Sequence, residues 1–132
     1  MLLATTGPSE QSPRPAMTAA ELQAAQRLVR QIPVGDSVVD AILSLVRSGR
    51  PDENAEGPRR FVAWGPGPRA SQALMLACRA RALIDGRYAP SIDDVLALAP
   101  PVLRHRMAVS FAGRAEGVTV TQVIDQMTMP LR

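Results

Sequence analysis

Three helix-start signals constrain the fold of this chain more than any other feature. Each is a capping box, in which a Ser or Thr hydroxyl and a side chain three residues later bind the exposed amides of a helix start. The boxes are Thr18–Glu21, Ser91–Asp94 and Thr119–Gln122, and each precedes an apolar run at helical spacing. Glycine and proline separate the runs. This pattern predicts an all-α bundle of about five helices, formed by residues 17–132.

Each expected helix begins at a cap or a proline and ends where glycine or proline interrupts the pattern. Asp36 is expected to cap the second helix through its side chain. Gly67-Pro68 opens the third, with proline at the first helical position. We expect helix starts at Thr18, Asp36, Pro68, Ser91 and Thr119, and the first four ends at Pro33, Ser48-Gly49, Asp85-Gly86 and Pro100-Pro101.

The third helix is predicted to be the centre of the bundle. Only four residues of the chain are aromatic, so the core must be built from Leu, Val, Ile and Ala. Alanines at helical spacing would let a second helix approach closely. Two short apolar runs, 61–64 and 109–111, are predicted to form one small β-pairing. The face expected on the third helix comprises Ala70, Ala73, Leu76, Ala77, Ala80, Leu83 and Ile84.

Two segments are expected to lie outside the bundle. Residues 1–16 contain prolines, a glycine and hydroxyls and are predicted to be a flexible linker, with Met1 to Gly7 the remnant of a preceding domain. Residues 48–60 are polar with two glycines and two prolines and are predicted to be an exposed, mobile loop.

The formal charge of +3 comes from fifteen arginines against twelve acids, since the chain has no lysine. Such a balance is compatible with nucleic-acid or phosphate binding, or with a composition bias of the source genome. Acids interleave with the arginines, so there is no long basic run. No stretch approaches the roughly 18 apolar residues of a membrane span, and no membrane partner is expected.

Enzyme and metal signatures are absent from the sequence. There is no phosphate-binding loop of the GxxxxGK[ST] type. Cys78 is the single cysteine, which excludes an internal disulfide and fits a reducing cytoplasm; we expect it to be a buried, inert thiol. His105 is flanked by arginines, which disfavours a bound cation, and is expected to be a surface or interface histidine. We therefore predict no metal site and no catalytic residue in this chain.

Arg69 departs from the local rules of helix stability. It lies in the first turn of the third helix, where a cation meets the positive end of the helix dipole. A bound anion would compensate both the arginine and the exposed amides. A solvent-directed arginine, or a salt bridge to Glu56 or Asp85, explains the position equally well.

Residues 61–116 resemble the lid region of MoxR-type AAA+ ATPases. The resemblance is carried by Gly65-Pro66-Gly67-Pro68-Arg69-Ala70, by Ala82 to Tyr88, by the Val102-Leu103-Arg104-His105-Arg106 run and by Glu116-Gly117-Val118-Thr119. Residues 18–32 also match the helix that opens such lids, so the resemblance covers about 110 residues. The two arginine motifs, in this order and spacing, are fairly specific.

The resemblance implies that Arg69 is the sensor 2 residue, which contacts the γ-phosphate of ATP, with Gly67 and Pro68 forming the helix start. It implies an N-terminal AAA+ domain of the same protein that binds ATP and Mg²⁺, neighbouring subunits of a hexameric ring, and a client protein that the sequence does not identify. The implied function is chaperone-like remodelling or metallo-enzyme maturation in the cytoplasm.

Two departures from the family pattern are local. Pro66-Gly67 stands where the family has Ala-Ser, so the helix loses its serine cap and has a weaker glycine cap. Arg114 stands where the family more often has an acid or a small residue. A larger departure is that the phosphate loop, Walker B strand, sensor 1 and arginine finger have no counterpart, so this chain by itself is not expected to be an ATPase.

Two other functions remain open. One is a small basic helical DNA-binding domain, although Arg69, Arg79 and Arg81 point to different sides of the third helix and so form no single basic face. The other is a standalone helical adaptor that docks through the alanine face.

Overall fold

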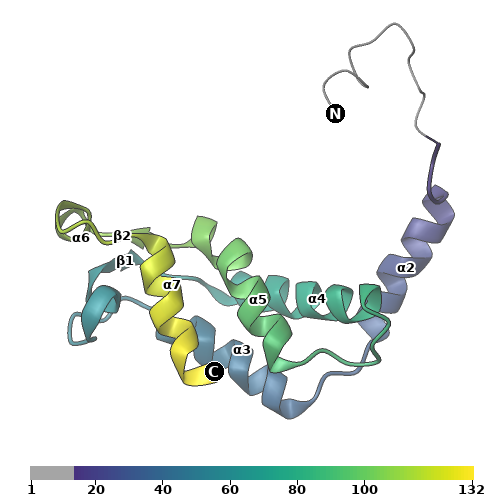
Figure 1. Ribbon diagram of the computed structural model, residues 1–132, viewed down its shortest axis with the longest axis horizontal. Helices are drawn as coiled ribbons and strands as arrows, with labels where there is room; N and C mark the ends of the chain where they lie inside the picture. The colour runs from purple at the N-terminus through teal and green to yellow at the C-terminus, as the bar shows by residue number, and fades with distance from the viewer. Residues whose placement is uncertain (1–13) are drawn as a thin grey trace, which may run out of the picture.

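The computed structural model describes residues 14–132, which form one helical bundle with a small β-pairing at one end (Figure 1). This confirms the predicted all-α class with one two-stranded β-pairing. Residues 1–13, most of the predicted linker, lie outside the described part. The α-helices are α2 (Ala19–Gln31), α3 (Asp36–Ser48), α4 (Pro68–Ile84), α5 (Ile92–Leu103), α6 (Phe111–Ala115) and α7 (Val120–Thr128). The strands are β1 (Val62–Trp64) and β2 (Ala108–Val109), and 3₁₀ turns span Gly57–Phe61, Arg104–Arg106 and Met129–Leu131.

The centre of the bundle is the contact between α4 and α5. Residues four apart on α4 are fully buried, and so are residues four apart on α5. Because several of these side chains are small, they let the two helices pack closely along these stripes. Helices α3 and α7 complete the core around this pair. The two stripes are Ala70, Leu74, Cys78 and Ala82 on α4, and Val95, Ala99 and Leu103 on α5.

The predicted alanine face of α4 is therefore partly wrong. Of its seven members only Ala70 is in the buried stripe, and Ile84 is 84% exposed. The helix contacts α2, α3 and α5 on different sides, so its apolar residues do not follow one face. Leu76, Ala77 and Ala80 are half-buried because they lie toward α2.

Local signals predicted the helix starts well. All three capping boxes form, with Thr18, Ser91 and Thr119 as the capping residues. Asp36 is a correction, because Gly35 is the N-cap of α3 and no side chain caps that helix. Asp36 instead occupies the first turn, where its charge favours the helix dipole.

The predicted end of α5 at Pro100-Pro101 is also wrong. The helix continues through both prolines to Leu103. Proline fixes a φ angle that suits a helix, and its cost is a lost amide donor and crowding of the preceding turn. Here the prolines lie in the last turns, and burial of Ala99 and Leu103 against α4 offsets that cost.

Strands β1 and β2 pair antiparallel, as expected for residues 61–64 and 109–111, although both strands are shorter. Val62 faces Val109 and Trp64 faces Ala108. Phe111 is not in the strand but begins α6, a helix that the sequence did not predict. The pairing returns the chain after α5 to the segment that precedes α4.

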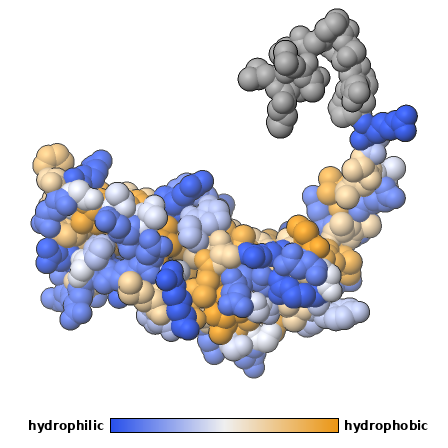
Figure 2. All heavy atoms as spheres, in the orientation of Figure 1, coloured by the Kyte–Doolittle hydropathy of each residue, from blue (hydrophilic) through white to orange (hydrophobic). Residues whose placement is uncertain are grey.

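Helix α2 is the least embedded element of the bundle. It contains no buried residue and projects from the end opposite the strands (Figure 1). Figure 2 shows hydrophobic surface gathered where this helix meets the bundle. Within the described residues, no helix has the length and apolar character needed to cross a lipid bilayer.

Candidate functional site

The turn before α4 is fixed by two glycines that meet face to face. A Cβ on Gly65 would lie inside contact distance of the Gly49 carbonyl oxygen, and a Cβ on Gly49 would lie 2.8 Å from Pro66 Cδ. Only hydrogen atoms fit between these backbones. This close approach holds the Gly65–Pro68 turn against the C-terminal end of α3 and so sets where α4 begins.

No side chain caps the N-terminus of α4, which is the positive end of its helix dipole. Gly67 is the N-cap and offers no side chain, while Pro68 fills the first helical position. The Gly67 carbonyl accepts the amide of Ala70 at 2.8 Å, so the backbone enters the helix without distortion. The field of the helix dipole therefore meets solvent at this point, next to the Arg69 side chain.

Arg69 is exposed and makes no ion pair with any residue of 14–132. The expected alternative of a salt bridge to Asp85 or Glu56 is wrong. Asp85 pairs with Arg81 and Arg87, and Glu56 is in none of the ion pairs of the described chain. The guanidinium is thus available to an anion that comes from outside the bundle.

A hollow of about 500 Å³ surrounds this arginine. One wall is the start of α4 and the other is the 3₁₀ turn that follows α5. Its lining contains two arginines and a histidine but no acid, so it is a cationic concavity of a size that suits a small ligand. The lining residues are Trp64, Gly67, Pro68, Arg69, Ala70, His105 and Arg106.

His105 and Arg106 are neighbours of Arg69 that sequence reasoning did not bring together with it. His105 is exposed, as expected for a surface histidine. Arg106 is half-buried, and its Nη1 donates to the Val102 carbonyl at 2.7 Å and contacts His105 Nε2. The predicted β-pairing was the signal that could have found them, because it returns the chain near residue 107 to the segment near residue 64.

A second charged cluster lies between α4 and α5 and is internally satisfied. The Asp94 carboxylate is 2% exposed. It accepts hydrogen bonds from both terminal nitrogens of Arg87, at 2.8 and 2.7 Å. Arg81 approaches the same carboxylate at 3.2 Å, and the Ser91 amide donates to it at 2.8 Å. The Arg87 hydrogen bonds hold the pKa of Asp94 below its usual range, against the opposing effect of burial. This cluster stabilises the fold and offers no free group to a ligand.

Arg79 and Arg81 each make a different structural contact. Arg79 is half-buried and donates to the Arg30 carbonyl of α2 at 3.2 Å, while Arg81 belongs to the Asp94 cluster. Neither shares a surface with Arg69, so α4 has no continuous basic face that could enter a nucleic-acid groove.

Cys78 lies at the α4–α5 contact with no exposed surface. Burial, reinforced by the nearby Asp94 charge, raises the pKa of its thiol to about 11. A thiol in this state is neutral and unreactive at physiological pH. The expectation that this cysteine is buried is confirmed, and its raised pKa is consistent with the expected lack of reactivity.

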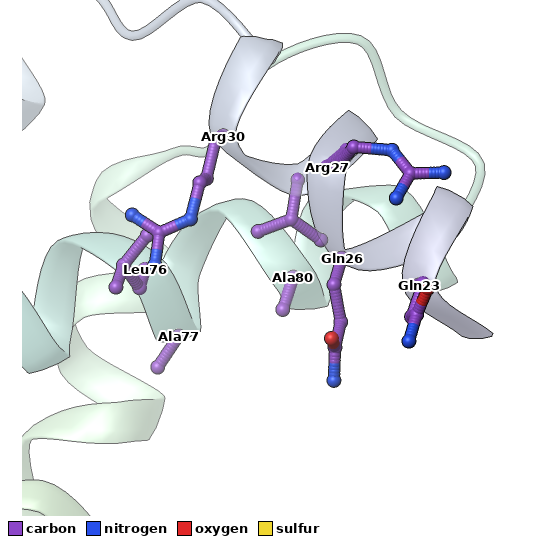
Figure 3. Close-up of a pocket in the computed structure, with 8 residues that line it drawn as sticks. Gln23, Gln26, Arg27, Arg30, Leu76, Ala77 and Ala80 are labelled. Atoms are coloured by element: carbon purple, nitrogen blue, oxygen red, sulfur yellow. The ribbon is translucent and has the colours of Figure 1, made fainter. Parts of the chain in front are cut away.

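A groove of about 640 Å³ lies along the contact between α2 and α4 (Figure 3). Its floor is formed by one leucine and two alanines of α4, and its rim carries glutamines and arginines of α2. The floor contains three members of the predicted alanine face, so that part of the face stays accessible. The lining residues are Gln23, Gln26, Arg27, Val29, Arg30, Leu76, Ala77 and Ala80.

The chain matches one family model and is similar to parts of longer proteins. The family model described as the AAA lid domain matches residues 57–127. "Chaperone MoxR1" of Mycobacterium tuberculosis is 31% identical over 96 residues, which are 71% of this chain and 26% of that protein. "Uncharacterized protein YeaC" of Bacillus subtilis is 31% identical over 102 residues, 77% of this chain and 30% of that protein.

A solved structure shares the fold. The crystal structure of a "putative ATPase" from Cytophaga hutchinsonii superimposes with a TM-score of 0.70 at 22% identity, over 81% of this chain and 32% of that chain. The chain therefore spans between about a quarter and a third of the length of the relatives it matches.

Proposed function

Because this chain is an AAA lid domain of the MoxR family, we propose that it serves as the C-terminal lid of an AAA+ ATPase and closes over ATP held by a companion N-terminal domain. Arg69 is the sensor 2 residue of this lid, and Gly67 and Pro68 form the helix start that presents it. The chain by itself does not hydrolyse ATP, because the phosphate loop and the Walker B strand belong to the companion domain.

The observation that carries this proposal is the state of Arg69. Its guanidinium is exposed, lacks an acidic partner in the described chain, and stands in a hollow whose lining contains no acid. A γ-phosphate supplies the charge that this position lacks, through charge-assisted hydrogen bonds to the guanidinium. The uncapped end of α4 adds a favourable field for the same anion.

The proposed coupling follows from the loss of that phosphate. Before hydrolysis, the triphosphate attracts Arg69 and holds the lid against the nucleotide domain. After hydrolysis and release of the γ-phosphate, this attraction is lost and the lid can rotate as a rigid body. The well-packed α4–α5 core is suited to such a movement because it transmits force without deforming.

The chemistry of the hollow fits a phosphate and does not fit its metal. Mg²⁺ binds carboxylates and phosphate oxygens, whereas the hollow offers cationic side chains. In this proposal, the companion domain holds the Mg²⁺ and most of the nucleotide, and the lid supplies one cationic contact.

The wider biological setting is proposed from the relatives. One of them is named a chaperone, and a lid of this kind would work in a hexameric ring, against neighbouring subunits, in remodelling of a client protein or maturation of a metallo-enzyme. The single, buried cysteine suits the reducing cytoplasm in which we place it.

The deciding experiment replaces Arg69 by alanine in the complete ATPase. We expect ATP turnover to fall about tenfold or more, since a charge-assisted contact to the transferred phosphoryl group is lost. Because Arg69 is exposed, the lid should unfold at the same temperature as the wild type.

Arg114 provides the matched control for that experiment. It is an exposed arginine on α6, outside the hollow. Its replacement by alanine should leave turnover unchanged. Equal turnover in the Arg69 variant and the wild type would refute the sensor role.

A further inference from the structure

The hollow around Arg69 contains a second guanidinium that the family resemblance does not assign. Arg106 lines the same concavity from the 3₁₀ turn after α5. Its position is fixed, because its Nη1 donates to the Val102 carbonyl of the preceding turn and contacts His105 Nε2. The remaining donors of this guanidinium make no hydrogen bond or ion pair within residues 14–132.

Two guanidinium groups line one concavity, and an anion bound between them would offset their mutual repulsion. Like charges in one concavity repel, and this hollow has no acid in its lining to offset them. The acids near α4 are engaged elsewhere, since Asp85 and Asp94 pair with Arg81 and Arg87. A phosphate group has enough oxygen atoms to accept hydrogen bonds from two arginines at once.

We propose that Arg106 is a second phosphate-binding residue, and that Arg69 and Arg106 together bind the terminal phosphates of a nucleoside triphosphate from the two walls of this hollow. The inference rests on the proposed function and adds a ligand-binding residue to it. Because the walls belong to different elements, the bound phosphate would join the start of α4 to the end of α5.

Trp64 makes the inference directly measurable. It is the chain's single tryptophan, it is 70% exposed, and it lines the hollow beside both arginines. An anion bound there would change its surroundings and therefore its fluorescence. The complete 132-residue chain can thus be titrated without a label.

The experiment titrates the chain with inorganic tripolyphosphate at constant, low ionic strength, because salt screens exposed charges. We expect a saturable change in tryptophan fluorescence. Arg106→Gln and Arg69→Gln should each weaken the affinity about fivefold, as expected for loss of one charge-assisted contact at a partly exposed site. Arg114→Gln, which removes the same charge outside the hollow, should bind like the wild type.

The variants separate the two proposals. If Arg69→Gln weakens binding and Arg106→Gln does not, the Arg106 inference is wrong and the sensor role of Arg69 stands. If both variants match Arg114→Gln, or if the wild type shows no saturable change, the hollow is not a phosphate site and both proposals lose their support.

The Arg106→Lys variant tests whether a loss of affinity in Arg106→Gln results from a change in structure. Lysine keeps the charge but cannot both donate to the Val102 carbonyl and present a second nitrogen in the planar guanidinium geometry. We expect intermediate affinity for this variant, with unchanged helical circular dichroism in all four variants. Wild-type affinity in a folded Arg106→Gln protein would overturn the inference.

Discussion

Asp94 is the one charged residue that is buried within residues 14–132. Its carboxylate lies between α4 and α5, where two arginines and a backbone amide surround it. It also completes the capping box of α5 with Ser91. The sequence predicted the capping role, because that signal is local. It gave no indication of Arg81 and Arg87, because their approach depends on how α4 packs against α5.

Asp94→Asn should destabilise the domain by about 2 kcal/mol. Removing one partner of a buried ion pair costs roughly 3–5 kcal/mol, and we expect less here because Arg81 and Arg87 are 43% and 37% exposed and can rehydrate. Urea unfolding followed by circular dichroism measures this difference. Asp93→Asn is the matched control, since Asp93 is an exposed residue of the same helical turn. An equal loss in both variants would show that the helix dipole, not the ion pairs, is responsible.

The same carboxylate predicts a dependence on pH. Its pKa is lower in the folded state than in the unfolded chain, chiefly because Arg87 donates to it. Its contribution to stability is therefore complete above the unfolded value of about 4 and is lost as the pH falls through the lower, folded value. The urea midpoint of the wild type should fall more steeply below about pH 4 than that of Asp94→Asn. Parallel curves for the two proteins would contradict this assignment.

The turn that carries Gly65 and Gly67 decides where α4 begins, and its two glycines have different tasks. Gly65 meets the backbone of Gly49, whereas a Cβ on Gly67 would touch nothing within 4 Å. The sequence predicted a helix start at Gly67-Pro68 and assigned no separate task to Gly65. Only the packing of β1 and α4 against the end of α3 shows which glycine is essential, since the contact joins residues distant in the chain.

Gly65→Ala should destabilise the domain by about 2 kcal/mol or more, because the added methyl group would displace backbone. Gly67→Ser should instead raise stability by a few tenths of a kcal/mol, since serine can accept a bond from an exposed amide of α4. Thermal unfolding of the two variants tests this pair. A Gly65→Ala protein as stable as the wild type would show that the turn can relax.

At the scale of the whole molecule, the first and last α-helices of the described chain, α2 and α7, contribute unequally to the stability of the bundle. Helix α2 contributes no buried residue, and its Leu22 and Leu28 are about half exposed. In α7, by contrast, Val123 and Ile124 are almost fully buried. Sequence periodicity predicted both helices equally well, because periodicity reports that a helix has an apolar side and not how much of that side is covered.

A chain of residues 32–132, which lacks α2, should therefore still fold cooperatively. We expect its melting temperature to fall by only a few degrees, since about 1 kcal/mol shifts a domain of this size by roughly 4–8 °C. A chain that ends at residue 118 and lacks α7 should not fold, and it is the control. Circular dichroism melts measure both. Loss of structure in the first truncation would mean that α2 contributes more to the core than its exposure indicates.

Sequence reasoning selected Arg69 as a candidate site residue but did not select Arg106. Arg69 was found because it violates a rule of helix stability that can be read within four residues. Arg106 was not connected to it, because the two are joined by the β1–β2 pairing and by α5 running past its prolines. The sequence predicted the β1–β2 pairing with approximate bounds. It predicted that α5 ends at its prolines, which is wrong.

Helix α4 has a consequence that follows from its length. Its 17 residues form a rod of about 25 Å, with Arg69 at the first turn and the seat of α2 in its second half. If α4 tilted about its first turn, the part of the helix that contacts α2 would move farther than the Arg69 end. In the proposed lid, a rotation of the bundle at the Arg69 end would therefore move α2 with it, without any rearrangement inside the core.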